Sequence, residues 1–169
     1  MAEHCRRDPA SGSLRATLAF LSEHAAAAGY MDVADWANNE RNGYRDAPPV
    51  YRHSPGAIVG YRAKKGWCPV PRSAHAPEAT VREIRQSISH IEHAIAAGRD
   101  GTAHVHLSAE TLEAINSAAG LQFAKAALAV DLAALQNVVR AVTSLSNKWS
   151  RDIRARAAPI RQQHPSARL

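Results

Sequence analysis

The sequence AETLEAINSAAGLQFAKAALAVDLAALQNVVRAVTSLSNKWSRDIRARA, residues 109–157, decides the fold that we expect for this chain. Ser108 is a favourable N-cap, and Leu112, Ile115 and Ala119 begin an apolar stripe at helical spacing. Beyond Gly120 the stripe continues through Leu121, Leu128, Leu132, Leu135, Val139, Val142 and Trp149. We expect one unbroken helix that ends just before Pro159, because a residue that precedes proline avoids the α conformation. A break at Gly120 is the alternative.

A second helix is predicted over residues 78–97. Pro77 suits a first-turn position, and Gly98 supplies a stop. The apolar residues between them follow a strict 3-4 spacing at Val81, Ile84, Ile88, Ile91 and Ile95. Residues 99–107 then read as a polar connection, so the sequence predicts a long helical hairpin over residues 77–158.

The N-terminal part predicts a shorter helical hairpin over residues 13–43. Ser13 can cap its first helix, Gly29 can end that helix, and Asp32 can cap the second, which closes near Gly43. Residues 1–12 read as a flexible tail and residues 159–169 as a disordered basic tail. The predicted fold is mainly α, a helical bundle with a long C-terminal helix and a small irregular β-hairpin or meander around residues 50–70.

The segment of residues 44–76 differs in composition from the rest of the chain. Five of the nine prolines fall between residues 41 and 72. Ser54-Pro55-Gly56-Ala57 predicts a type II turn, and Lys64-Lys65-Gly66 predicts a second turn. Short β-compatible runs lie at residues 50–53, 57–62 and 67–70. A basic loop without strands is the alternative.

Composition and charge limit the classes of partner that we expect for this chain. The 169 residues are 46% hydrophobic and 21% charged, and aromatic residues make up only 5%. The net charge is +6, from 21 basic and 15 acidic side chains. Residues 41–72 hold seven basic side chains against one acid, Asp46. A block of this kind suits a polyanion or an acidic protein surface.

Aromatic residues stand beside these cations in three Tyr-Arg pairs. Aromatic faces can stack on bases while cations meet phosphates. The candidate contact residues are Arg45, Tyr51, Arg52, Tyr61, Arg62, Lys64, Lys65, Trp67 and Arg72. We expect a protein that binds nucleic acid or a nucleoprotein complex. The alternatives are a protein–protein interaction module, such as an inhibitor, adaptor or assembly component, that docks on an acidic partner, and aromatic side chains that only pack the segment.

Other functions receive less support from the sequence. His90, His93, His104 and His106 could approach one another across a chain reversal, but their spacing matches no standard zinc module, so they are weak metal candidates. We expect no metal and no cofactor. The sequence contains no G-x-S-x-G, Walker A, H-E-x-x-H or C-x-x-C motif, so we do not expect an enzyme.

The remaining expectations concern assembly and compartment. The long apolar stripes predict a homo-oligomer. Lys125 and Asp131 interrupt the longest apolar region, so we expect no membrane span and a cytoplasmic protein. Cys5 and Cys68 are expected to be free thiols.

Overall fold

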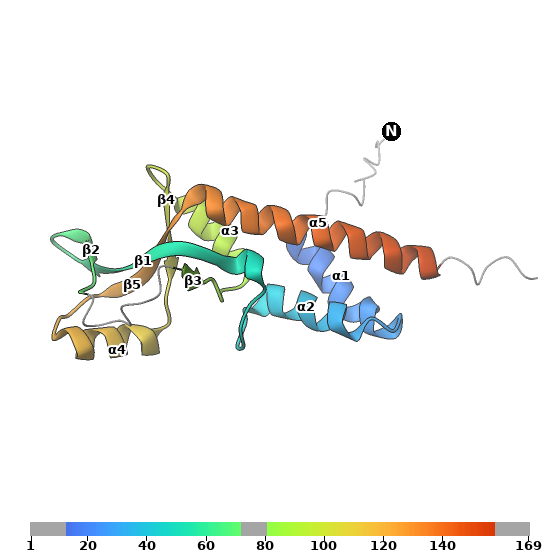
Figure 1. The fold of residues 1–169 in the computed structure, drawn as a ribbon, viewed down its shortest axis with the longest axis horizontal. Coiled ribbons are helices and arrows are strands. Elements are labelled where there is room, and N and C mark those ends of the chain that lie inside the picture. Colours follow the sequence, from blue (N-terminus) through green and yellow to red (C-terminus); the bar gives the residue numbers. More distant parts are fainter. Residues whose placement is uncertain (1–12, 72–80, 158–169) are drawn as a thin grey trace, which may run out of the picture. The chain divides into compact units, whose positions relative to one another are not determined.

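The structure, a computed structural model, describes residues 13–71 and 81–157. Within these ranges it contains five α-helices and a five-stranded antiparallel sheet (Figure 1). About 56% of the described residues are helical and 22% are strand, so the fold is mixed α/β. The prediction of a mainly helical bundle is therefore wrong. The predicted tails, residues 1–12 and 159–169, lie outside the described residues, as do Cys5 and Arg72.

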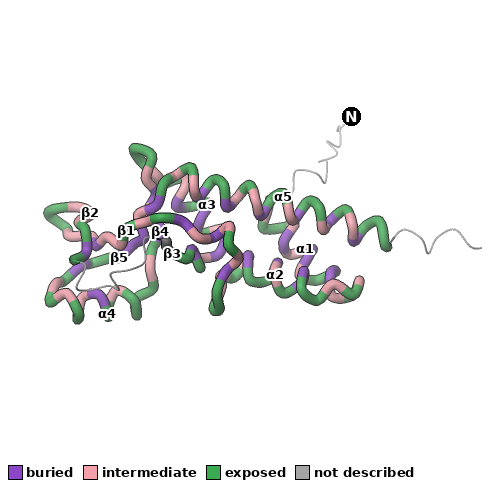
Figure 2. The backbone as a smooth tube through the Cα atoms, viewed as in Figure 1, coloured by how far each residue is buried: buried purple, intermediate pink, exposed green. Residues whose placement is uncertain are grey.

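The chain forms two compact units. Unit 1 contains the residues up to Asn42 and those from Val142 onward, and unit 2 is Gly43–Ala141. Helix α5 (Leu132–Ala157) contributes to both, because the boundary falls within it. Buried residues recur between exposed ones along α5 (Figure 2), at Leu135, Val138, Val142, Ser146, Ser150 and Ile153. This spacing of three and four residues gives the helix one buried face.

In unit 1, α1 (Leu14–Ala27) and α2 (Met31–Asn42) occupy the range over which we expected a helical hairpin. The hydroxyl of Ser13 accepts a hydrogen bond from the backbone N–H of Ala16 at 3.3 Å. Gly29 adopts φ +84° in the turn between the two helices, a conformation that other residues rarely adopt. Local capping and turn chemistry therefore account for this part of the chain.

Unit 2 is built on the sheet, whose strand order is β2-β1-β5-β4, with β3 also paired to β1. The strands are β1 (His53–Arg62), β2 (Gly66–Pro69), β3 (Val81–Glu83), β4 (Thr102–His106) and β5 (Lys125–Asp131). The helices are α3 (Ile88–Ala97) and α4 (Ala109–Ala119), the first turns of α5, and a 3₁₀ turn, η2 (Val50–Arg52).

The single helix predicted over residues 109–157 is replaced by α4, β5 and α5. The predicted alternative, a break at Gly120, is the observed one: this glycine ends α4 in the left-handed conformation at φ +60°. Strand β5 (Lys125–Asp131) then follows, with partners on both sides, β1 and β4. Such a strand is apolar on both faces, and its run of alanines and leucine fits helical spacing as well as it fits a strand.

The helix predicted over residues 78–97 is also wrong in its first half. Strand β3 occupies residues 81–83, and α3 begins only after Ser87, whose hydroxyl accepts from the backbone N–H of His90 at 3.4 Å. Gly98 ends α3 as expected. The predicted polar connection over residues 99–107 contains β4, which pairs with β5.

The hairpin expected around residues 50–70 is present, although one of its two predicted turns is wrong. Ser54-Pro55-Gly56-Ala57 lies within β1, and Pro55 pairs there with Val81 of β3. The chain turns instead at residues 63–65, before Gly66 with φ +73°. This second predicted turn joins β1 to β2.

One face of the sheet is closed by a small apolar cluster of Val70, Ile115, Phe123 and Ala126. The side chain of Asn116 fixes Phe123 in place, because it accepts from the backbone N–H of Phe123 at 2.8 Å and donates to its carbonyl oxygen at 3.1 Å. Cys68 packs against this cluster as a free thiol. Within the described ranges, the helices lack the combined length and apolar character that crossing a membrane requires.

Candidate functional site

The end of the β1–β2 hairpin gathers aromatic and basic side chains. Tyr61 on β1 is the register partner of Trp67 on β2, and on its other side it faces Lys125 of β5. Lys64 and Lys65 lie in the turn between β1 and β2, where both are exposed. The backbone N–H of Lys65 closes this turn on the carbonyl oxygen of Arg62 at 3.0 Å. Strand pairing thus brings three lysines to one end of the sheet.

Trp67 is the centre of an aromatic cluster on the same sheet face. Its ring stacks on His104 of β4, with centroids 4.5 Å apart and planes inclined by 8°. His106 lies at 5.8 Å in a tilted arrangement, and Tyr61 meets the indole edge-on at 5.4 Å. We call the set Tyr61, Trp67, His104 and His106, with Lys64, Lys65 and Lys125 at its end, the Trp67 face.

Small side chains make this stacking across strands possible. Ala127 on β5 pairs with Val59 on one side and with His106 on the other, so it lies on the same sheet face. It is fully buried, and Ala129 follows it as the partner of His104. A larger residue at position 127 would fill the space over which the rings of β2 and β4 meet.

Helix α3 borders the cluster and encloses a cavity of about 190 Å³. The cavity is lined by Trp67, by Ala94 and Ala97 of α3, and by His90, His93, His104 and His106. The chain reversal therefore does bring all four histidines to one cavity. In the described part of the chain, however, no three His, Cys, Asp or Glu side chains are grouped closely enough to hold a metal ion.

The lysines carry positive charge on the Trp67 face at neutral pH. Burial lowers the pKa of His104 below its usual range, and the neighbouring His106 lowers this pKa further. His104 is thus neutral at pH 7 and stacks on Trp67 as an uncharged ring. His106 is exposed.

Comparison with known protein families decides the classification of the chain. The model of the family described as AbiTii matches residues 10–167. The chain belongs to the AbiTii family. This is an abortive-infection family. No curated protein and no solved structure matches the chain.

In this AbiTii chain, Arg52 is the candidate contact residue whose position differs most from the sequence-based expectation. Its side chain is fully buried. The Nη1 atom donates to the carbonyl oxygens of Ile84 at 3.0 Å and Gln86 at 2.6 Å, and the guanidinium lies 5.0 Å from the centre of the Tyr44 ring. Arg52 therefore holds η2 to the segment after β3, and its guanidinium is buried instead of lying on a contact surface.

The other candidates are divided between different places. Arg62 points away from Tyr61 and lies over the Phe123 ring at 5.2 Å, on the opposite face of the sheet. Arg45 is exposed in the segment that precedes η2, where its carbonyl oxygen accepts from Arg85 at 2.7 Å. Tyr51 is half-buried within η2. Of the eight candidates among the described residues, Tyr61, Lys64, Lys65 and Trp67 belong to the Trp67 face.

Sequence reasoning did not include Lys125, His104 or His106 in the contact surface. Lys125 was read as part of a helix, and the two histidines as part of a polar connection. The signal that could have placed them is the alternation His104-Val105-His106, with one buried residue between two more accessible ones. Alternation over three residues is too short to be decisive by itself.

Proposed function

We propose that this AbiTii chain has a defence role as a binding domain and that its Trp67 face binds single-stranded nucleic acid. The proposal rests on one observation: a half-exposed tryptophan, stacked on a neutral histidine, lies beside three lysines at the end of an antiparallel sheet. Proteins that bind single strands combine aromatic platforms for bases with cations that follow the phosphates. Membership of an abortive-infection family supports the defence role.

The role that we propose for each residue of the Trp67 face follows from the chemistry of its side chain. Trp67 and Tyr61 would stack on unpaired bases, and His106 would extend this platform at the edge of the sheet. Lys64, Lys65 and Lys125 would contact phosphates, which gives affinity without a strong choice of sequence. We further propose that the domain acts by binding and not by catalysis, since these side chains are suited to stacking and charge.

Salt dependence gives the proposal a quantitative form. For single strands, the slope of log K against log salt is about −0.7 per phosphate neutralised. Three lysines that each neutralise one phosphate therefore predict a slope of about −2. Stacking contributes a part that salt does not remove, about 1–3 kcal/mol per base.

The test is fluorescence anisotropy of a labelled single-stranded oligonucleotide, titrated with the full chain at several salt concentrations. Trp67→Ala should weaken binding at every salt concentration, whereas the double variant Lys64→Glu, Lys65→Glu should both weaken binding and flatten the salt dependence. Arg45→Glu is the matched control, because Arg45 is an exposed cation of the same basic segment that lies outside the Trp67 face.

Absence of binding by the unmodified chain to single-stranded DNA and RNA at about 50 mM salt would contradict the proposal, since the electrostatic term is strong there. Equal losses in the Arg45 variant and the lysine variant would contradict the assignment to this face. An acidic protein partner, the alternative reading of the same cations, would appear instead as a bound protein that nuclease treatment does not release.

A further inference from the structure

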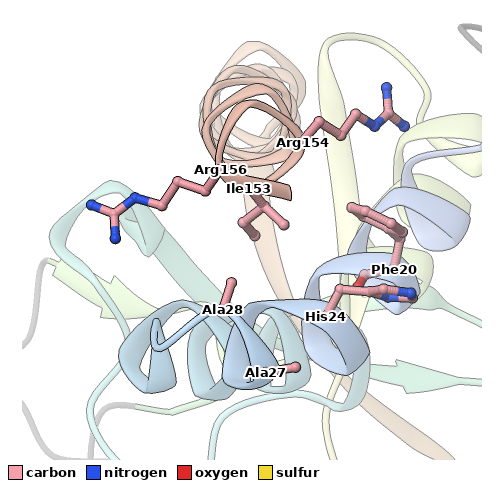
Figure 3. Close-up of a pocket in the computed structure, with 7 residues that line it drawn as sticks. All are labelled: Phe20, His24, Ala27, Ala28, Ile153, Arg154 and Arg156. Atoms are coloured by element: carbon pink, nitrogen blue, oxygen red, sulfur yellow. The ribbon is translucent and has the colours of Figure 1, made fainter. Parts of the chain in front are cut away.

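Unit 1 contains a cavity of about 590 Å³, which lies between α1 and the last turns of α5 (Figure 3). Helix α1 provides Phe20, His24 and Ala27, its C-cap residue Ala28 follows, and α5 provides Ile153 together with two arginines. In Figure 3, Ile153 points from α5 toward Ala28 at the C-terminal end of α1, and the two arginines extend to opposite sides. The volume lies within the range of small-molecule sites.

The apolar part of the cavity is preformed by ring stacking. Phe20 and His24 stack with centroids 4.3 Å apart and planes inclined by 20°. The Nδ1–H of His24 donates to the carbonyl oxygen of Phe20 at 2.9 Å, which fixes the imidazole against the phenyl ring. Phe20 is half-buried and His24 is exposed, so the rings offer an aromatic surface to a ligand.

The charged part consists of Arg154 and Arg156. Arg154 lies over the Phe20 ring at 5.4 Å from its centre, and Arg156 lies over the Tyr30 ring at 4.7 Å. Neither guanidinium has an ion pair with a carboxylate of the described residues. Stacking on rings leaves the N–H groups at the guanidinium edges able to bind an anion, and it reduces the entropy lost when they do so.

The helix dipole explains only part of this arrangement. Cations in the last turn of a helix offset its partial negative charge, and both arginines are placed to do so. That role does not require an apolar cavity between the two side chains, nor an aromatic pair facing it. An occupant that is apolar in the middle and anionic at one end matches both features.

We propose that this cavity binds a small amphipathic anion, a carboxylate or sulfonate that carries an aromatic or branched apolar body. The body would lie against Phe20, Ala28 and Ile153, and the anionic group would bind the N–H groups of Arg154 or Arg156. This site is independent of the Trp67 face, because every residue that forms it belongs to unit 1.

Anilinonaphthalene sulfonate is a suitable probe, since it is an aromatic anion whose fluorescence rises in an apolar site. The full, folded chain should enhance its emission in a saturable way, and an alkyl carboxylate such as decanoate should displace it. The double variant Arg154→Gln, Arg156→Gln should weaken binding about tenfold, as expected for losing a hydrogen bond to a charged group. In the same variant, the affinity for the neutral analogue phenylnaphthylamine should fall by less than about twofold, because this analogue lacks the anionic group.

Two further variants complete the test. Arg151→Gln removes an exposed cation of the same helix that does not line the cavity, so it should leave the affinity unchanged. Ala28→Leu fills the apolar part and should weaken both the anionic and the neutral probe. Thermal melting of each variant separates these effects from unfolding, which also raises the emission of this dye. Equal affinities of the unmodified chain and the Arg154, Arg156 variant would overturn the proposal, as would no saturable emission with the folded chain.

Discussion

The buried guanidinium of Arg52 offers the sharpest test of the fold of unit 2. We consider Arg52→Met, which preserves the length and apolar stem of the side chain but removes its donors. The carbonyl oxygens of Ile84 and Gln86 then lose the hydrogen bonds that the Nη1 atom donates to them. The cation–π contact with Tyr44 is lost as well.

The expected loss of stability follows from these contacts. A hydrogen bond to a charged group contributes about 1.5–3 kcal/mol, and two of them give about 3–6 kcal/mol. We adopt the lower part of that range, about 3–5 kcal/mol, because methionine keeps the apolar stem of the side chain and its packing. For a chain of this size, each kcal/mol lowers the melting temperature by about 2–4 °C. Arg52→Met should therefore melt about 6–20 °C below the unmodified chain.

The assay is thermal and urea unfolding followed by circular dichroism, with Arg45→Met as the matched control. Arg45 is exposed, and the hydrogen bond that it accepts from Arg85 is made by its backbone, so the control should change the melting temperature by less than about 2 °C. If Arg52→Met and Arg45→Met had the same melting temperature, Arg52 would not be the buried residue described above. Its predicted role as a surface contact would then be restored.

Three other predictions concern single positions. Gly60→Ala should destabilise the chain by about 1–3 kcal/mol in urea unfolding, because its new Cβ would overlap the Phe123 ring; an unchanged midpoint would contradict the close packing of β1 on that ring. Ser146→Ala should leave the stability unchanged or raise it by up to about 1 kcal/mol, since the fully buried Oγ has no hydrogen-bond partner in the described part of the chain, and a clear loss would refute this. Burial and the neighbouring His106 lower the pKa of His104 in the folded state. The stability that its neutral ring contributes is therefore present above about pH 6.5, and it is lost as the pH falls toward the lowered pKa. Between about pH 7.5 and 5.5 the melting temperature should therefore fall less in His104→Phe than in the unmodified chain, and equal slopes would contradict this assignment.

The parts of the fold that the sequence predicted are those that depend on local chemistry. Ser13 caps α1 and Gly29 turns the chain toward α2, both within a few residues of the positions that they affect. Gly120 likewise ends α4, as one of the two alternatives required. Such signals lie in consecutive residues and need no knowledge of the rest of the chain.

Strand β5 could not be distinguished from helix, because its pairing partners lie far away in the sequence. Its neighbours β1 and β4 cover both edges, and both of its faces are largely buried, so the alternation that marks a half-buried strand is missing. The expected homo-oligomer rested on a continuous stripe of the single long helix. That support is lost, since Leu128 belongs to a strand while Leu135 and Val142 belong to α5, and homo-oligomerisation stays a prediction.

The candidate site was predicted only in part, again because strand pairing joins residues that are far apart in the sequence. Lys64, Lys65 and Trp67 are close in sequence and stay together on one hairpin. Lys125 and His104 join them only through pairing with β1 and β5. The sequence could not show that Arg52 is buried either, because burial is decided by residues that follow it by more than thirty positions.

The most direct test of the central proposal is the salt dependence of single-strand binding for three proteins: the unmodified chain, the Lys64→Glu, Lys65→Glu variant and the Arg45→Glu variant. We predict a log–log slope of about −2 for the unmodified chain and for the Arg45 variant, and a clearly shallower slope with weaker binding for the lysine variant. Absence of binding by the unmodified chain at low salt, or equal slopes in all three proteins, would contradict the assignment of the Trp67 face as a nucleic-acid interface.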